Sequence, residues 1–133
     1  MDKYLSNKFL TLFVRKQWYD MIVSGEKTEE YREIKGFWMS RFLLVKDEES
    51  EEYKKLHIAK NTEMLINTDI IKEKINDGTM KFVPFTIVRF INGYRKDSPR
   101  IYKDIESITI GKPQKGMCPD KWLDTEFFII KFK

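Results

Sequence analysis

The feature that most constrains the fold of this chain is a set of short runs of strand-forming residues separated by turn signals. Apolar residues that alternate with polar ones are typical of strands that bury one face. The clearest run is 85–91, Phe-Thr-Ile-Val-Arg-Phe-Ile, which ends at the turn dipeptide Asn92-Gly93. The other predicted strands are residues 9–15, 28–32, 100–110 (one or two strands) and 126–132. Five or six short strands with helical additions predict an α+β fold built on a small β-barrel.

Two early segments have the spacing of short helices. Residues 16–24 place Trp18 and Ile22 on one apolar stripe, and Gly25 follows where a helix is expected to end. Residues 37–44 also have apolar side chains at helix-like spacing. The sequence therefore predicts an early helix between the first two strands and a second helix soon after them.

The middle of the chain has a different composition. The charged stretch 47–60 is predicted as a helix or loop, and a later helix is predicted with Asp69 as its N-cap, running through 70–75 and stopping at 76–78. We therefore expect residues 47–80 to form a helical insertion.

Length and composition limit the class of protein. With 133 residues the chain suits a single domain over 1–133. The one cysteine, Cys118, cannot form an internal disulfide, and with the lone His57 it cannot build a His/Cys zinc site, so a reducing cytoplasmic setting without metal or cofactor is expected. No secretory signal and no run of about 20 apolar residues is visible, so we expect no membrane partner.

The net charge of +4 is unevenly distributed along the chain. Residues 1–46 carry +3, residues 47–80 carry −4 and residues 81–133 carry +5, and the acidic excess is concentrated in 47–52. The two basic segments would present a positive face if they met in space. This distribution permits an RNA or DNA partner without demanding one.

Residues 25–32 read Gly-Glu-Lys-Thr-Glu-Glu-Tyr-Arg, which matches the pattern Gly-x-Lys-x-x-Glu-x-Arg at a helix-to-strand junction. This pattern resembles the signature of the ASCH domain, a branch of the PUA-like β-barrels. The segments 92–100 and 108–111 are also similar to phage and bacterial members. The resemblance covers about 9–46 and 84–133 and leaves the insertion unmatched. It implies a PUA-like barrel that binds RNA or a modified nucleoside in a cleft beside the barrel.

The motif residues have physical reasons to act together. Glu30 and Arg32 are two apart on a predicted strand and so lie on one face, and Lys27 at the turn can lean over the same patch. A cleft lined by these three side chains would offer hydrogen-bond donors to a phosphate or to the edge of a base, and the carboxylate would be its one acceptor. If aromatic walls desolvate Lys27, its neutral amine could act as a general base. The alternative interpretation is a surface turn with an ordinary ion pair.

The resemblance also implies two hydrolase alternatives. Some ASCH members are similar to amidohydrolases acting on N-acetylcytidine, in which a threonine stands where this chain has Glu30, and that departure counts against this activity. For a ribonuclease, Lys27 would be the base or phosphate clamp, Tyr94 and Ser98 would be donors, and Arg100 or Arg32 would stabilise developing charge. The candidate catalytic residues are thus Lys27, Glu30 and Tyr94.

The remaining candidates concern binding. Arg32, Ser98, Arg100 and Trp122 are the candidate ligand-binding residues, and Trp122 lies in a Pro-rich loop that could cover a cleft. Cys118 has no basic neighbour that would favour a thiolate, so we do not expect it to be catalytic. A third class of function is a non-catalytic protein-interaction module that uses the acidic stretch 47–52.

Overall fold

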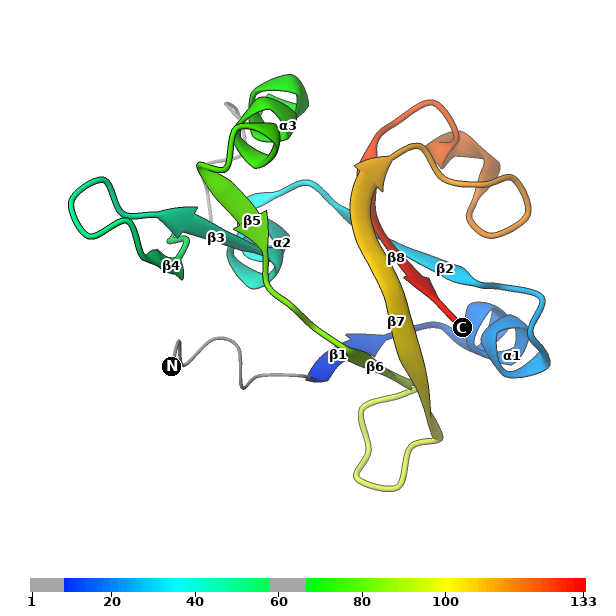
Figure 1. The fold of residues 1–133 in the computed structure, drawn as a ribbon. Helices are drawn as coiled ribbons and strands as arrows, with labels where there is room; N and C mark the ends of the chain where they lie inside the picture. The colour runs from blue at the N-terminus through cyan, green and yellow to red at the C-terminus, as the bar shows by residue number, and fades with distance from the viewer. Residues whose placement is uncertain (1–8, 58–66) are drawn as a thin grey trace. The chain divides into compact units, whose positions relative to one another are not determined.

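The computed structural model describes residues 9–57 and 67–133, and within them the chain is an α+β protein with three α-helices and two sheets (Figure 1). The elements in chain order are β1 (Phe9–Phe13), α1 (Lys16–Ser24), β2 (Glu29–Glu33), α2 (Gly36–Phe42), β3 (Leu43–Lys46), β4 (Tyr53–Lys55), α3 (Thr68–Asn76), β5 (Met80–Phe82), β6 (Ile87–Ile91), β7 (Arg100–Gly111), the 3₁₀ helix η2 (Asp120–Trp122) and β8 (Phe127–Phe132). The predicted α+β class is confirmed.

The chain divides into two compact units. The sheet unit consists of Asn7–Tyr31 and Phe85–Lys133, and the insert unit consists of Met1–Ser6 and Arg32–Pro84. The insert unit therefore begins before the insertion that we predicted at residue 47.

The larger sheet has the strand order β1-β6-β7-β8-β2. β1 pairs with β6 in parallel, and β6, β7 and β8 pair in antiparallel fashion along the chain. Among the described residues, β1 and β2 are edge strands and no closed barrel forms, so the predicted closure is not found. The sequence could not decide closure, because it depends on pairing between strands far apart in the chain.

The strand patterns follow the predicted alternation. Leu10 and Leu12 of β1 and Val88 and Phe90 of β6 are fully buried on one face of the sheet. The Phe90 ring packs against Phe132 of β8 with 4.9 Å between ring centroids. Burial of these side chains gives this face its apolar core.

Residues 100–111 form one long strand rather than two. β7 has 12 residues, and its register with β8 shifts between Ile105 and Ser107. A bulge of this kind bends a strand, and Figure 1 shows β7 as a long curved arrow. The loops at the two ends of β7 therefore lie at different ends of the sheet unit.

Helix α1 ends as the sequence predicted and sets the position of Lys27. Gly25 has a φ of 86°, in the left-handed region that glycine adopts without steric cost, and its N–H donates to the carbonyl of Ile22. The Lys27 N–H then donates to the carbonyl of Met21 at 3.0 Å. The chain is thereby turned directly into β2.

The insert unit contains a second sheet, with the order β4-β3-β5. The predicted helix 37–44 ends at Phe42, because Leu43 and Leu44 are buried in β3 and pair with β5. A run of apolar residues fits a helix or a strand equally well, and tertiary pairing decides between them. Within the predicted insertion 47–80, the described residues form helix α3 together with strand β4 and the first residue of β5.

The predicted N-cap of the later helix is corrected. Helix α3 is capped by Asn67, whose side chain accepts from the Asp69 N–H at 2.9 Å, so Asp69 lies inside the helix. In the segment 47–60, predicted as a helix or loop, residues 48–50 form a turn and β4 follows, and residues 58–60 lie outside the described residues. In the described ranges, no helix has both the length and the apolar character needed to cross a membrane.

Candidate functional site

The side-chain amine of Lys27 is buried in the sheet unit, with 1% of the residue exposed. It donates a short hydrogen bond to the Met117 carbonyl and lies 3.7 Å from Oε1 of Glu30. Its Nζ is also 5.2 Å from the ring centroid of Trp18 and 4.8 Å from that of Tyr31. A carbonyl, a carboxylate and two aromatic faces thus surround this amine, all of which favour positive charge.

Two adjacent carboxylates of β2 are buried beside it. Oε1 of Glu30 also accepts from the N–H of Tyr31 at 2.9 Å. Glu29 accepts from the Tyr31 hydroxyl at 2.8 Å, and that hydroxyl in turn accepts from the Gln114 N–H at 3.1 Å. We call Lys27, Glu29, Glu30 and Tyr31 the buried polar cluster.

Burial also sets the protonation of two neighbouring groups. Desolvation, with Glu29 next to the hydroxyl, raises the pKa of Tyr31 well above its ordinary value, although the Gln114 N–H acts in the opposite direction. Desolvation likewise raises the pKa of the Cys118 thiol, against the lowering influence of Lys27. Tyr31 is therefore a phenol donor at neutral pH, and Cys118 is a neutral thiol rather than a nucleophile.

The loop between β7 and β8 packs onto the buried polar cluster. Tyr31, Cys118 and Phe127 form an apolar group, against which Met117, Trp122, Leu123 and Ile129 pack. The Trp122 ring stacks on Phe127 with 4.9 Å between centroids. Trp122 thus lies in the loop that carries Met117, as part of the packing around Tyr31.

Arg32 follows Tyr31 across the boundary between the two units and belongs to the insert unit. There its guanidinium lies over the Trp38 ring, 5.3 Å from the centroid. Trp18 and Trp38 are both half-buried, and each ring contacts a cation.

The other three predicted residues gather at the opposite end of β7 from Met117. Tyr94 and Ser98 lie in the loop before β7, and Arg100 is its first residue. Ser98 is buried, and its hydroxyl accepts from the Arg95 N–H at 2.8 Å, while the Arg100 guanidinium donates to the carbonyls of Ser98 and Lys96. The 12 residues of β7 separate these side chains from the loop that contacts Lys27. The structure therefore does not bring Tyr94, Ser98 or Arg100 to the buried polar cluster.

Sequence reasoning missed three members of the site. Glu29 and Tyr31 flank Glu30 in β2, and the side chains of all three are buried. Met117 is 90 residues from Lys27 in the chain, and no local pattern indicates that its carbonyl meets the amine. The available signal was the Tyr31 ring beside the two adjacent carboxylates Glu29 and Glu30 in a short strand.

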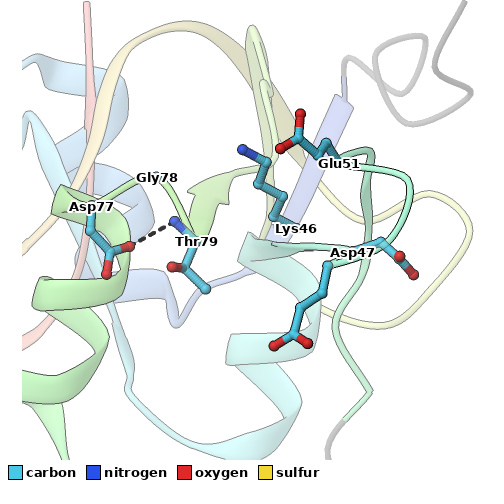
Figure 2. A pocket seen from close by; sticks show the side chains of 7 residues that line it. Lys46, Asp47, Glu51, Asp77, Gly78 and Thr79 are labelled. Atoms are coloured by element: carbon cyan, nitrogen blue, oxygen red, sulfur yellow. Dashed lines mark hydrogen bonds between the residues drawn. The ribbon is translucent and has the colours of Figure 1, made fainter.

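The acidic stretch of the insert unit lines an open pocket of about 300 Å³ (Figure 2). The pocket residues are Lys46, Asp47, Glu48, Glu51, Asp77, Gly78 and Thr79. Asp77 accepts from the Thr79 N–H at 2.8 Å, and Asp47 accepts from the N–H groups of the turn that follows it. These carboxylates are used to close turns, and among the described residues no group of three or more His, Cys, Asp or Glu gathers to hold a metal ion.

Charge is also distributed unequally between the units. The sheet unit contains 14 basic and 10 acidic residues, whereas the insert unit contains 11 of each. The whole net charge of +4 therefore belongs to the unit that holds the buried polar cluster. In comparisons with known proteins, no family model, curated protein or solved structure matches the chain.

Proposed function

We propose that this chain binds RNA or a nucleotide through its sheet unit, with Lys27 and Glu30 at the centre of the site, as a PUA-like protein of the ASCH class. The observation that carries the proposal is the buried ion pair between Lys27 and Glu30, 3.7 Å apart. Removing an ammonium and a carboxylate from water costs several kcal/mol per ion, and an apolar pair of similar volume often gives equal stability. Stability alone therefore gives little reason to keep this buried pair, which favours a functional role for it.

The chemistry of the pair fits the edge of a nucleobase. The Lys27 amine donates hydrogen bonds, as a base carbonyl or a phosphate requires, and the Glu30 carboxylate accepts them, as an exocyclic amino group requires. The rings of Trp18 and Tyr31 lie close to the amine and supply flat apolar walls. A ligand carbonyl would compete with the Met117 carbonyl for the Lys27 amine.

The binding experiment compares the wild type with a double variant, Lys27→Met with Glu30→Gln, which removes both charges and keeps the volume. A panel of short RNAs and modified nucleosides, including N-acetylcytidine, is titrated by calorimetry. We expect at least one member to bind the wild type and to bind the double variant at least tenfold more weakly. Lys131→Met is the matched control, because its amine is exposed and pairs with Glu106 in the same unit. Equal binding by all three proteins would refute the assignment.

A hydrolase that uses the same groups is the second candidate. The observation that favours it is that the Lys27 amine lies close to the Glu30 carboxylate and that both are buried. A proton can pass between a donor and an acceptor held in this way. The test is chromatographic detection of cleaved RNA or deacetylated cytidine. We expect turnover to be lost in the double variant and kept in Cys118→Ala, and binding without any product would leave binding alone as the function.

A further inference from the structure

One face of the sheet unit carries exposed aromatic rings on neighbouring strands. In the register of the sheet, Thr11 of β1 is opposite Arg89 of β6, and Arg89 is opposite Tyr102 of β7. The Arg89 Nη2 donates to the Thr11 hydroxyl at 2.9 Å, so these side chains share one face. Because side chains alternate along a strand, Phe9 and Phe13 lie on that face with Thr11. The buried residues Leu10 and Leu12 lie on the other.

The rings on this face are unusually open to solvent. Phe9 is 51% exposed, Phe13 45%, Tyr102 51% and Tyr94 87%. Tyr94 stacks on Phe13 with 5.0 Å between ring centroids and 27° between planes, so the loop before β7 extends the face beyond the strands. We call Phe9, Phe13, Tyr94, Tyr102, Arg89 and Arg100 the aromatic face.

Cations accompany the rings. Arg89 lies between the strands that carry Phe13 and Tyr102, and Arg100 is directly opposite Ile91, next to the Tyr94 loop. Arg95 and Lys96 are exposed in that same loop. The acidic groups near the face are Asp97 in the loop and Asp104, which is opposite Ile87 near the Phe9 end. Four cations against two carboxylates match the positive charge of the sheet unit.

We propose that the aromatic face binds single-stranded nucleic acid, with bases stacked on the rings and phosphates paired with the arginine and lysine side chains. Base stacking on aromatic rings, together with a positive surface, is the general mode by which single strands are bound. A duplex keeps its bases stacked on one another and cannot use exposed rings in this way. An apolar protein partner would leave the cations of the face unpaired.

The inference takes its ligand class from the proposed function but places the ligand elsewhere. The Tyr94 loop and the loop that contacts Lys27 lie at opposite ends of β7. A nucleic-acid strand bound to the aromatic face would therefore contact none of the residues of the buried polar cluster. The two sites can be tested separately.

The experiment measures anisotropy of fluorescein-labelled U12 RNA, dT12 and a 12-base-pair duplex with the full chain. We expect both single strands to bind more tightly than the duplex. Tyr94→Ala weakens U12 binding by on the order of tenfold, while Tyr94→Phe keeps it, because the ring and not the hydroxyl does the stacking. Phe37→Ala, at an exposed ring of the insert unit, is the control expected to show no change. Arg95→Gln with Lys96→Gln reduces the slope of log affinity against log salt by about 1.4.

The possible outcomes distinguish failure of the aromatic face from failure of the proposed nucleotide site. U12 binding that survives in the Lys27→Met/Glu30→Gln variant and falls in Tyr94→Ala supports the aromatic face even if the proposed nucleotide site fails. Binding that falls in the double variant and is unchanged in Tyr94→Ala overturns the aromatic face and leaves the proposed function standing. The inference is also overturned if neither single strand binds, if the duplex binds as well as U12, or if light scattering shows a dimer that Tyr94→Ala dissociates.

Discussion

The sheet unit and the insert unit hold their polar side chains in different environments. Among the described residues, the buried polar or charged ones are Lys27, Glu29, Glu30 and Ser98, and all four belong to the sheet unit. In the insert unit the corresponding groups, such as Asp47 with Lys54, are ion-paired at the surface. Water can replace a lost surface partner, whereas it cannot reach a buried one. The same chemical change should therefore have different effects in the two units.

The largest expected effect is on folding when one member of the buried ion pair is removed. Lys27→Met leaves the Glu30 carboxylate without its counter-charge in the core, and we expect the free energy of unfolding to fall by about 3–5 kcal/mol. Lys54→Met removes an exposed amine from Asp47 and should cost less than about 1 kcal/mol. Urea unfolding followed by circular dichroism measures both.

A double variant separates the missing charge from lost packing. Glu30→Gln added to Lys27→Met removes the uncompensated carboxylate, so a large part of the lost stability should return. If Lys27→Met and Lys54→Met had equal effects, the distinction between the two units would not hold.

An intermediate effect is expected at Tyr31, whose hydroxyl joins Glu29 to the Gln114 N–H. Tyr31→Phe leaves both groups short of a partner and should cost about 1–3 kcal/mol at neutral pH. Because the folded-state pKa of Tyr31 is raised above its ordinary value of 10.0, the wild type keeps this stability below pH 10 and loses it as pH rises further.

The pH dependence makes the Tyr31 prediction specific. The stability difference between wild type and Tyr31→Phe should shrink above pH 10 in urea unfolding experiments. A difference that stays constant from pH 8 to pH 11 would show that the hydroxyl is not buried as described.

Local sequence patterns predicted much of the sheet unit. The alternation in 9–15 and 85–91 and the glycine after 16–24 identify two strands and a helix end, because these depend on neighbouring residues. The pairing of Lys27 with Glu30 was also predictable, since they are three apart at a turn. The contact with Met117 depends on the path of a distant loop, and no local signal indicates it.

Tertiary pairing limited prediction elsewhere. In the insert unit, residues 43–46 have a pattern compatible with a helix, yet they become β3 because β4 and β5 pair on either side. Sequence reasoning grouped Tyr94 and Arg100 with Lys27, and the structure does not bring them together, for a similar reason. β7 is one long strand, and a break within it would have been needed to bring its first residue back toward the other end.

The smallest effect is expected at Asp47 in the insert unit. Hydrogen bonds from the backbone N–H of Ser50, from Lys54 and from the N–H of Glu49 lower the pKa of Asp47 to about 2. An aspartate with a lowered folded-state pKa contributes stability above its unfolded pKa, near 4, and loses that contribution as pH falls toward 2. Asp47→Asn should therefore lower the urea midpoint slightly at pH 6, and the two proteins should converge near pH 2.

Because Asp47 is open to solvent, about 0.5 M salt should reduce the part of this difference that comes from Lys54 but leave the backbone hydrogen bonds. A midpoint difference that persisted unchanged at pH 2 would show that the carboxylate charge is not what closes this turn, and it would remove the contrast with the buried carboxylates of β2.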